Sequence, residues 1–251
     1  MHDNPVALVT GANQGIGFQI AKELTHKGFT VLLGSRNLER GETAAREIGP
    51  GAVAIQLDVT DQASVTTAAE RVRQEFGRLD VLIQNAAIST TADQMPTPEE
   101  YLRAHRPSVA PLAEMRAVWD TNVFGVLSVY QAMLPILRDT PNSRIVNVSS
   151  GAGSLTLVSD PNSPIRSFFD ATYAASKAAM NALTVAMAIE LEAEGIKVNA
   201  VSPGYTKTKL NGFDGTDTLE EGAAEAVRVA LLGSEGPTGT FTHATMGTIP
   251  W

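Results

Sequence analysis

The chain has 251 residues, a length that suits one large α/β domain, and no break in its composition divides it. Its 19 Lys and Arg residues are outnumbered by 27 Asp and Glu residues, and the net charge of −8 argues against a protein that neutralises nucleic-acid phosphates. The absence of Cys excludes disulfides, a thiol nucleophile and a Cys-based metal site.

The first predicted element is a strand at residues 6–9. No basic region precedes it and its apolar run is short, so we do not interpret the segment as a signal peptide. Nowhere do about 18 apolar residues follow one another, as a membrane-spanning helix requires. Together with the lack of Cys, these features predict a cytoplasmic protein that binds neither membranes nor nucleic acids.

The sequence TGANQGIG follows directly and opens into a helix predicted over residues 16–27. Gly11 permits a tight turn, Gly15 lets the backbone approach a pyrophosphate, and Gly17 lets helix and strand pack closely. The helix start offers unpaired N–H groups to the anion. This arrangement is typical of a dinucleotide-binding turn, with a purely structural turn as the alternative. A P-loop is excluded because Phe18, not Lys, follows the last glycine.

The second predicted strand, residues 30–33, continues as TVLLGSRN. A site that prefers NAD places a carboxylate near this point, where it binds the ribose 2′-hydroxyl. Here Ser35 and Arg36 occupy the position and Arg40 follows, so a 2′-phosphate would meet cations. The strand end therefore predicts NADP(H). Alternatively, Arg36 and Arg40 are solvated residues at a helix start.

The rest of the chain alternates short β-branched runs with stretches of helical period. Further strands are predicted at residues 53–56, 81–84, 145–148, 197–201 and 239–241. Helices are predicted at residues 61–76, 112–134, where Pro135 ends the pattern, and 172–194. This alternation predicts a single α/β domain over residues 1–251, a doubly wound Rossmann fold of about seven parallel strands with helices on both faces.

Two stretches show neither pattern: residues 89–111, with four prolines, and residues 151–170, rich in Ser, Pro and Asn. Both leave from predicted strand ends. Ligands of parallel sheets bind beyond the carboxyl ends of the strands, so we expect two loops at the mouth of a site. Plain surface insertions are the alternative.

The sequence YAASK places Tyr173 and Lys177 four residues apart on a predicted helix, hence on one face. A phenol titrates near pH 10, so proton donation at neutral pH needs a nearby positive charge. Lys177 can supply it, and so can the oxidised nicotinamide ring of a bound cofactor. The pair alone is not specific evidence, because the spacing is common by chance.

Taken together, the motifs resemble those of the short-chain dehydrogenase/reductase family over essentially the whole chain. They are, in order, TGANQGIG, LDV at 57–59, QNAA at 84–87, Asn122, IVNVSS at 145–150, YAASK and SPG at 202–204. VALVTGANQGIGF, GSRNLERG, SPGYTKT and EEGA are most similar to the family's NADPH-dependent carbonyl reductases. The chain departs from the family pattern at Ala87, where glycine is usual, and in the long segment before Tyr173.

The resemblance implies four catalytic residues. Tyr173 would be the general acid towards a carbonyl, and Lys177 would hold the nicotinamide ribose and lower the pKa of the phenol. Ser150 would donate a hydrogen bond to the substrate oxygen, and Asn122 would hold a water in a proton relay. Ser150 is preferred to Ser149 because the family pattern Ser-x-x-Gly begins at Ser150.

The resemblance also implies cofactor contacts along the chain. Asp58 and Val59 would flank the adenine, Asn85 would face the adenosine side, and Thr208 would approach the carboxamide and phosphates. The full predicted set is Gly11, Asn13, Gln14, Gly15, Ile16, Gly17, Ser35, Arg36, Asn37, Arg40, Asp58, Val59, Asn85, Ala86, Ala87, Tyr173, Lys177, Pro203, Gly204, Thr206 and Thr208.

These observations predict an NADPH-dependent carbonyl reductase that transfers a hydride to an aldehyde, ketone or quinone. An NAD-dependent alcohol dehydrogenase on the same scaffold and a non-catalytic dinucleotide sensor are the alternatives. We expect a monomer, because the inserted segment before the Tyr–Lys helix would cover the face that pairs subunits in the wider family. No metal is expected, because the four histidines lack ligand spacing and we expect them on the surface: His2, His26, His105 and His243.

Overall fold

The computed structural model describes residues 4–251, and in this part of the chain eight strands form one sheet in the order β3-β2-β1-β4-β5-β6-β7-β8. Every neighbouring pair is parallel except β7 and β8. The predicted doubly wound fold is therefore confirmed. The strands are β1 Val6–Thr10, β2 Thr30–Ser35, β3 Ala52–Gln56, β4 Val81–Gln84, β5 Arg144–Val148, β6 Lys197–Ser202, β7 Phe241–His243 and β8 Gly247–Thr248.

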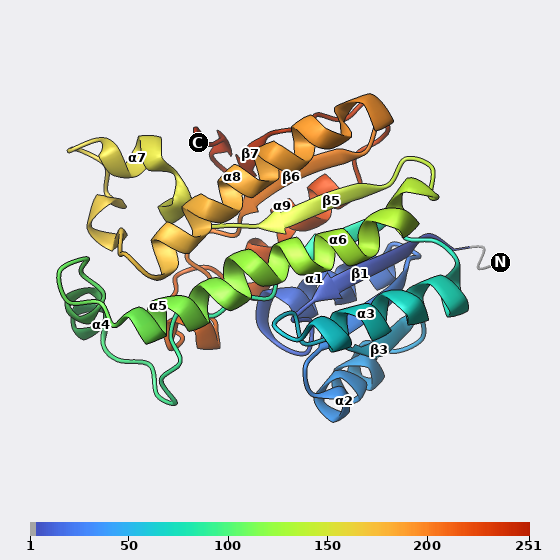
Figure 1. The fold of residues 1–251 in the computed structure, drawn as a ribbon, viewed down its shortest axis with the longest axis horizontal. Helices are drawn as coiled ribbons and strands as arrows, with labels where there is room; N and C mark the ends of the chain where they lie inside the picture. The colour runs from blue at the N-terminus through green and yellow to red at the C-terminus, as the bar shows by residue number, and fades with distance from the viewer. Residues whose placement is uncertain (1–3) are drawn as a thin grey trace.

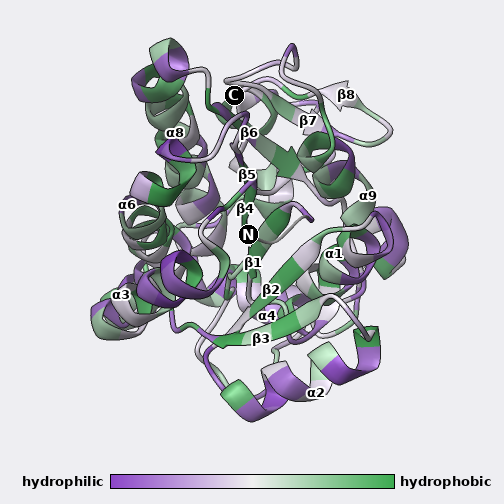
Figure 2. Ribbon diagram, turned by 90° about the vertical axis from the view of Figure 1, so that its right-hand side faces the viewer, coloured by the Kyte–Doolittle hydropathy of each residue, from purple (hydrophilic) through white to green (hydrophobic). Residues whose placement is uncertain are grey.

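Helices cover both faces of the sheet (Figure 1). Figure 2 shows α3, α6 and α8 on one side of the strands and α1, α2 and α9 on the other. None of the helices within residues 4–251 is long and apolar enough to cross a membrane. The helices are α1 Gly15–His26, α2 Leu38–Ile48, α3 Gln62–Arg71, α4 Pro98–Ala104, α5 Leu112–Trp119, α6 Gly125–Arg138, α7 Leu155–Ser159, α8 Tyr173–Leu191 and α9 Leu219–Ala230.

The strands are apolar on both faces because each face is covered by helices. In β1, Val6 and Leu8 join the core beneath α3, α6 and α8, whereas Ala7 and Val9 join the core beneath α1, α2 and α9. All five residues of β1 are buried. This rigid centre fixes where the carboxyl ends of β1, β4, β5 and β6 lie, and therefore where a site can form.

The seventh strand begins later than its predicted range of 239–241, because Gly239 adopts a φ of 69° and belongs to a turn. The two-residue strand β8 was not predicted. It turns back on β7 at Gly247, and two residues are too few to show an alternating pattern.

The predicted helix at residues 112–134 is interrupted. It consists of α5, a π-helical turn at Asp120–Phe124, and α6, which continues through Pro135 to Arg138. The residues after the proline, Ile136 and Leu137, are buried, so apolar packing holds the helix past the point where proline removes a hydrogen bond. The predicted helix at 61–76 likewise ends in a π-helical turn, Val72–Phe76.

The two stretches predicted as loops contain short helices, which corrects the sequence interpretation. Thr97 and Glu100 form a capping box at the start of α4, with Pro98 in the first turn. Ser154 caps α7 by accepting a hydrogen bond from the Leu157 N–H. Figure 1 places α4 and α7 at the same end of the molecule, beyond the strands of the central sheet.

The inserted segment does not lie along the outer face of α8, as the monomer expectation assumed. Its helix α7 contacts the segment after β5 and the carboxyl-terminal residues, where Trp251 O accepts a hydrogen bond from Thr156 N at 3.0 Å. On α8, Ala182, Ala186 and Ile189 remain exposed. The inserted segment therefore leaves this part of α8 uncovered, and the oligomeric state stays a prediction.

Candidate active site

A cavity of about 450 Å³ lies at the carboxyl ends of the central strands. Ser150, just after β5, and Tyr173 and Lys177 of α8 line it together, as the sequence predicts. The glycine turn after β1 borders the same cavity through Ile16. The fold thus brings the predicted proton donor, its basic neighbour and the dinucleotide-binding turn to one place.

Tyr173 is the first residue of α8, and Lys177 follows one turn later on the same face. The Lys177 Nζ atom lies 5.7 Å from the centroid of the Tyr173 ring. It donates a hydrogen bond to the carbonyl oxygen of Val148 at 2.8 Å, and the side chain is buried. The lysine is therefore anchored to the end of β5 as well as to α8.

The phenol is less acidic than the sequence analysis expected. Burial raises the pKa of Tyr173 to about 12; a hydrogen bond with Ser150 acts to lower it and the charge of Asp170 to raise it. Burial also lowers the pKa of Lys177 to about 7, because the ammonium loses its hydration. In the protein without cofactor, Lys177 does not offset this rise, because the same burial disfavours both charges.

The preference for Ser150 over Ser149 agrees with their hydrogen bonds. Ser149 Oγ is buried and donates to Asn181 Oδ1 at 2.5 Å, on the core side of α8. Both serines line the cavity, but Ser150 is half-buried and is the one that acts to lower the pKa of Tyr173. Ser150 is thus the serine that can approach a substrate oxygen beside Tyr173.

Asn122 lies in the π-helical turn between α5 and α6 and is fully buried. Its amide nitrogen donates to Ile88 O at 2.8 Å and to Ser176 Oγ at 3.0 Å, and its oxygen accepts from Ile88 N at 2.9 Å. These bonds join the segment after β4 to α8. The side chain is engaged in this contact, which differs from the predicted role of holding a water.

The glycine turn has the backbone conformation that its sequence predicts. Gly11 and Gly15 have φ values of 64° and 60°, in the left-handed region that glycine tolerates. A Cβ atom at Gly11 would meet Ala86 Cα at 3.0 Å, so the segment after β4 lies directly against the turn.

Gly17 makes room for Asn85. A Cβ atom on Gly17 would lie 2.4 Å from Asn85 Nδ2, which itself donates to Thr10 O at 2.9 Å and to Gly11 O at 3.2 Å. The Asn85 side chain therefore holds the shape of the turn. This is a different contact from the predicted one with adenosine, and the spacing of the glycines alone did not reveal it.

The start of α1 is suited to bind an anion. Its N-cap residue, Gln14, makes no side-chain capping hydrogen bond, so first-turn N–H groups have no side-chain partner there. Thr208 approaches from the other side, with its Cγ2 atom 3.7 Å from the place a Cβ would take on Gly15. A glycine cradle, an uncapped helix start and a facing hydroxyl residue together fit a dinucleotide pyrophosphate.

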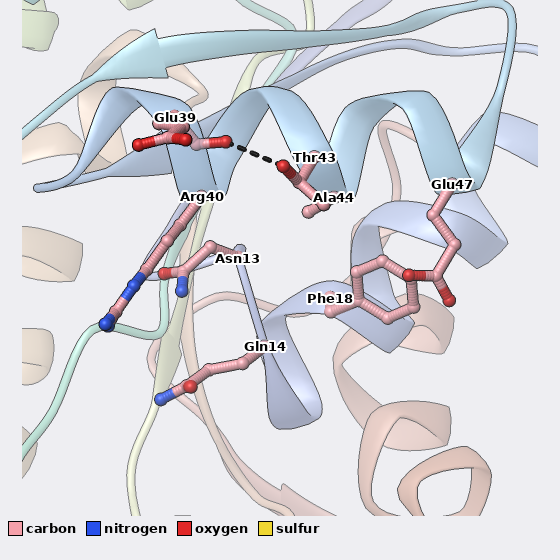
Figure 3. A pocket seen from close by; sticks show the side chains of 8 residues that line it. All are labelled: Asn13, Gln14, Phe18, Glu39, Arg40, Thr43, Ala44 and Glu47. Atoms are coloured by element: carbon pink, nitrogen blue, oxygen red, sulfur yellow. Dashed lines mark hydrogen bonds between the residues drawn. The ribbon is translucent and has the colours of Figure 1, made fainter.

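A second hollow, of about 600 Å³, lies between the glycine turn and α2, where Asn13 and Arg40 line it (Figure 3). Arg36 and Arg40 are exposed, and no salt bridge engages either within residues 4–251. Ser35 is buried and donates to Asn37 O at 2.7 Å, while Asn37 Oδ1 caps α2. The structure thus leaves Asn13 and the two arginines available, and gives Ser35 and Asn37 the role of shaping the turn.

Most of the other predicted contact residues follow the ends of β3, β4 and β6. Asp58 Oδ1 accepts from Thr60 N at 3.0 Å and from Thr60 Oγ1 at 2.7 Å, and Val59 is buried against Gly125. Ala86 N donates to Thr10 Oγ1 at 3.0 Å. Six further residues border the cavity itself: Ile16, Ala87, Pro203, Gly204, Thr206 and Thr208.

The two stretches expected at the mouth of a site, residues 89–111 and 151–170, do line the cavity, but the sequence analysis did not predict that its wall is largely apolar. It comes from the α4 region, the α7 segment and the chain near β8: Met95, Pro96, Tyr101, Leu102, Leu157, Ile165, Phe168, Met246 and Ile249. Asp170 was also missed, because it stands three residues before the helix and not at the N-cap position, which Thr172 occupies.

Two histidines differ from the surface role expected for them. His105 is buried, with its ring stacked on Tyr101 at a centroid distance of 4.0 Å and its Nδ1 atom 2.7 Å from Tyr101 O. His243 lines the cavity, where its Nδ1 atom accepts from Thr245 N at 3.2 Å. His2 lies outside the described residues.

The sheet, the glycine turn and the Ser–Tyr–Lys group define an α/β protein of the dinucleotide-binding class. The family described as short chain dehydrogenase matches residues 5–218. The chain is 36% identical to short-chain dehydrogenase anuI of Penicillium roqueforti (strain FM164), across 92% of this chain and 90% of that protein. It is 32% identical to salutaridine reductase of Papaver somniferum (94% and 93% covered) and 33% identical to (-)-isopiperitenone reductase of Mentha piperita (94% and 95%).

Solved structures agree with the sequence relatives. The structure of salutaridine reductase from Papaver somniferum has a TM-score of 0.79 and 29% identity, covering 95% of this chain and 99% of that one. A 3-ketoacyl-(acyl-carrier-protein) reductase from Brucella melitensis, complexed with NADH, has a TM-score of 0.79 and 25% identity, covering 96% of each chain. The chain belongs to the short-chain dehydrogenase family, and it is an oxidoreductase of the nicotinamide-dependent kind.

Proposed function

We propose that the protein is an NADPH-dependent carbonyl reductase. The observation that carries this proposal is that Ser150, Tyr173 and Lys177 line one cavity, which the glycine turn also borders through Ile16. Two hydroxyls side by side can hold one carbonyl oxygen, so that its carbon lies where a hydride can reach it.

The preference for NADPH rests on charge at the end of β2. Arg36 and Arg40 are exposed there, and Asn13 lines the same hollow as Arg40. A 2′-phosphate on the adenosine ribose would find guanidinium groups, which bind phosphate through charge-assisted hydrogen bonds. The similar 3-ketoacyl-(acyl-carrier-protein) reductase was solved in complex with NADH, so the two cofactors have to be compared directly for this chain.

In the proposed reaction, bound NADPH supplies the hydride. Tyr173 donates its hydroxyl proton to the oxygen that becomes the alcohol, and Ser150 donates a hydrogen bond to the same oxygen. The phenol of Tyr173 has to lose a proton during each turnover, so its raised pKa must fall when cofactor and substrate bind in the cavity. A protonated Lys177 beside the ring provides positive charge for that change.

The cavity wall favours apolar, uncharged carbonyl compounds. Lys177 is the only Lys or Arg among the lining residues of the described chain, and it is anchored to Val148. A carboxylate or phosphate on the substrate would therefore lose water without gaining a cation. Aldehydes, ketones and quinones with apolar bodies suit the wall formed by Met95, Phe168 and Met246.

The test is oxidation of NADPH, followed by its absorbance, in the presence of aldehydes, aryl ketones, diketones and quinones. We expect turnover with apolar members of this set. We also expect NADPH to saturate the enzyme at a lower concentration than NADH does. Lack of turnover with every compound would contradict the reductase proposal. Tighter binding of NADH than of NADPH would favour the NAD-dependent alternative.

We further propose that the protein is a cytoplasmic monomer. The lack of Cys supports a reducing compartment. The exposed residues of α8 are Ala182, Ala186, Ile189 and Glu190, of which only Ile189 is a large apolar side chain, so this face offers little apolar area for a stable interface. A solution mass near the chain's 26.5 kDa supports the monomer, and a mass that falls on Ile189→Glu substitution contradicts it.

A further inference from the structure

Asp170 is a buried carboxylate at the end of the inserted segment, three residues before Tyr173, and only 4% exposed. Its Oδ1 atom accepts hydrogen bonds from Thr172 N and Tyr173 N, both at 2.7 Å, and its Oδ2 atom accepts from Ala174 N at 3.1 Å. One side chain therefore holds three successive backbone N–H groups at the start of α8.

These bonds act on the turn that carries the proton donor. N–H groups of the first helical turn have no partner within the helix, so the direction of this turn depends on the residue that caps it. Tyr173 is the first residue of α8, where an uncapped helix would fray. A negative charge at a helix start also interacts favourably with the helix dipole, which stabilises the buried carboxylate.

The same carboxylate faces other polar groups. Tyr101 and His105, in the α4 region, are its neighbours. The charge of Asp170 raises the pKa of Tyr101, and Ala171 N donates a hydrogen bond to His105 O. Glu114 of α5 also acts on Tyr101, and Lys177 approaches Tyr173 from α8. No salt bridge neutralises Asp170 within residues 4–251. Its charge opposes ionisation of Tyr173. An ion pair therefore does not explain why a carboxylate lies at this position, whereas its hydrogen bonds to the backbone N–H groups at the start of α8 do.

We propose that Asp170 is a positioning residue, which caps the first turn of α8 and thereby holds the Tyr173 hydroxyl beside Ser150. The inference rests on the proposed carbonyl reduction for its kinetic meaning. It assigns a role to the inserted segment beyond forming the cavity wall, because this segment ends in the cap of the catalytic helix.

Two substitutions separate capping from charge. Asp170→Asn keeps an acceptor oxygen for Thr172 N and Tyr173 N but removes the charge, whereas Asp170→Ala removes both. Asp61→Ala is the matched control: it removes a comparable cap from α3, where Asp61 Oδ1 accepts from Ala63 N at 2.9 Å. All four proteins are compared at saturating NADPH, by kcat, KM, NADPH affinity and melting temperature.

We expect Asp170→Ala to lower kcat by about tenfold or more, as displacement of a reacting group does, with NADPH affinity within about twofold of wild type. Asp170→Asn should keep kcat within about threefold, because two of the three bonds persist. Asp61→Ala should lower the melting temperature without lowering kcat. Equal kcat for Asp170→Ala and wild type, or equal losses for Asp170→Ala and Asp170→Asn, would overturn the positioning role.

A second readout does not need turnover. With ¹³C-labelled tyrosine, the Cζ signal of Tyr173, assigned with Tyr173→Phe, reports the surroundings of the hydroxyl. Asp170→Ala should shift or broaden this signal, and Asp61→Ala should leave it unchanged; an unmoved signal in Asp170→Ala contradicts the inference. If wild type reduces no carbonyl compound, the proposed function fails, while this signal still decides whether Asp170 positions Tyr173.

Discussion

Burial acts in opposite directions on Tyr173 and Lys177, which share one face of α8. It raises the pKa of the phenol to about 12 and lowers the pKa of the ammonium to about 7, so in the protein alone burial disfavours the charged form of each side chain. The pair is therefore suited to a reaction in which charge develops only when cofactor and substrate are bound.

Replacement of Tyr173 by Phe removes the proposed proton donor while keeping the ring. We expect kcat to fall by at least about 100-fold, the typical contribution of a general acid, while NADPH affinity stays nearly unchanged. Steady-state kinetics and fluorescence titration measure the two quantities. Tyr130→Phe is the control, because the Tyr130 hydroxyl donates to Glu190 Oε2, away from the cavity. Unchanged turnover in Tyr173→Phe would remove this residue from the mechanism.

Lys177 should make the stability of the unliganded protein depend on pH. Its folded pKa of about 7 lies below the value of about 10.4 expected in an unfolded chain. Between these values the unfolded state binds more protons, so the free energy of unfolding rises with pH, by up to about 1.4 kcal/mol per pH unit. Lys177→Met should lose this slope between pH 7 and about 9.5, below the ordinary pKa of tyrosine.

Urea unfolding across this pH range measures the slope. The exposed Lys207 provides the control, since Lys207→Met should keep the wild-type dependence. Loss of the hydrogen bond to Val148 O shifts the stability of Lys177→Met but adds no pH dependence of its own. The same slope in wild type and Lys177→Met would show that the buried ammonium is not its source.

The arginines after β2 should distinguish NADPH from NADH. Loss of a charged hydrogen bond to phosphate costs about 1.5–3 kcal/mol, so Arg36→Ala or Arg40→Ala should weaken NADPH binding by about 10-fold to 100-fold. NADH binding should change little, because that cofactor lacks the 2′-phosphate. Calorimetric titration with both cofactors checks this result. Equal weakening of both would place the 2′-phosphate elsewhere.

Gly17 should tolerate no side chain. In Gly17→Ala the new Cβ would lie 2.4 Å from Asn85 Nδ2 and 2.6 Å from Gly11 O, so the amide that holds the turn must move. We expect NADPH affinity to fall together with the melting temperature. Gly233→Ala is the control, because a Cβ there meets no atom within 4 Å. Wild-type NADPH affinity in Gly17→Ala would contradict the role given to Asn85.

The central fold was predictable because the local sequence patterns of its strands and of the glycine turn agree with the structure that they adopt. Buried parallel strands show continuous apolar runs, and Gly11 and Gly15 require the conformation that the turn adopts. Tyr173 and Lys177 were predictable as a pair because helical spacing alone brings them to one face. The capping box at Thr97 was readable in the sequence, but four prolines nearby favoured a loop interpretation.

Other features depend on contacts between distant segments. Asn85 reaches the glycine turn, and Asn122 joins the segment after β4 to α8, through bonds that no periodic pattern reveals. The burial of His105 depends on how α4 packs near Asp170. The pKa values of Tyr173 and Lys177 likewise follow from desolvation in the folded cavity, which spacing along the chain does not determine.

The proposed catalytic residues of the cavity lie on the central sheet and α8. Much of the cavity wall comes instead from the regions of α4 and α7, two short helices in separate inserted segments of the chain. Such a division makes the molecule modular. Relatives could diverge in the compounds they accept by exchanging residues 95–102 or 155–168 while the hydride-transfer apparatus is inherited intact. Transplanting these two segments between relatives should carry selectivity with them, provided that Asp170 is left behind to anchor the helix.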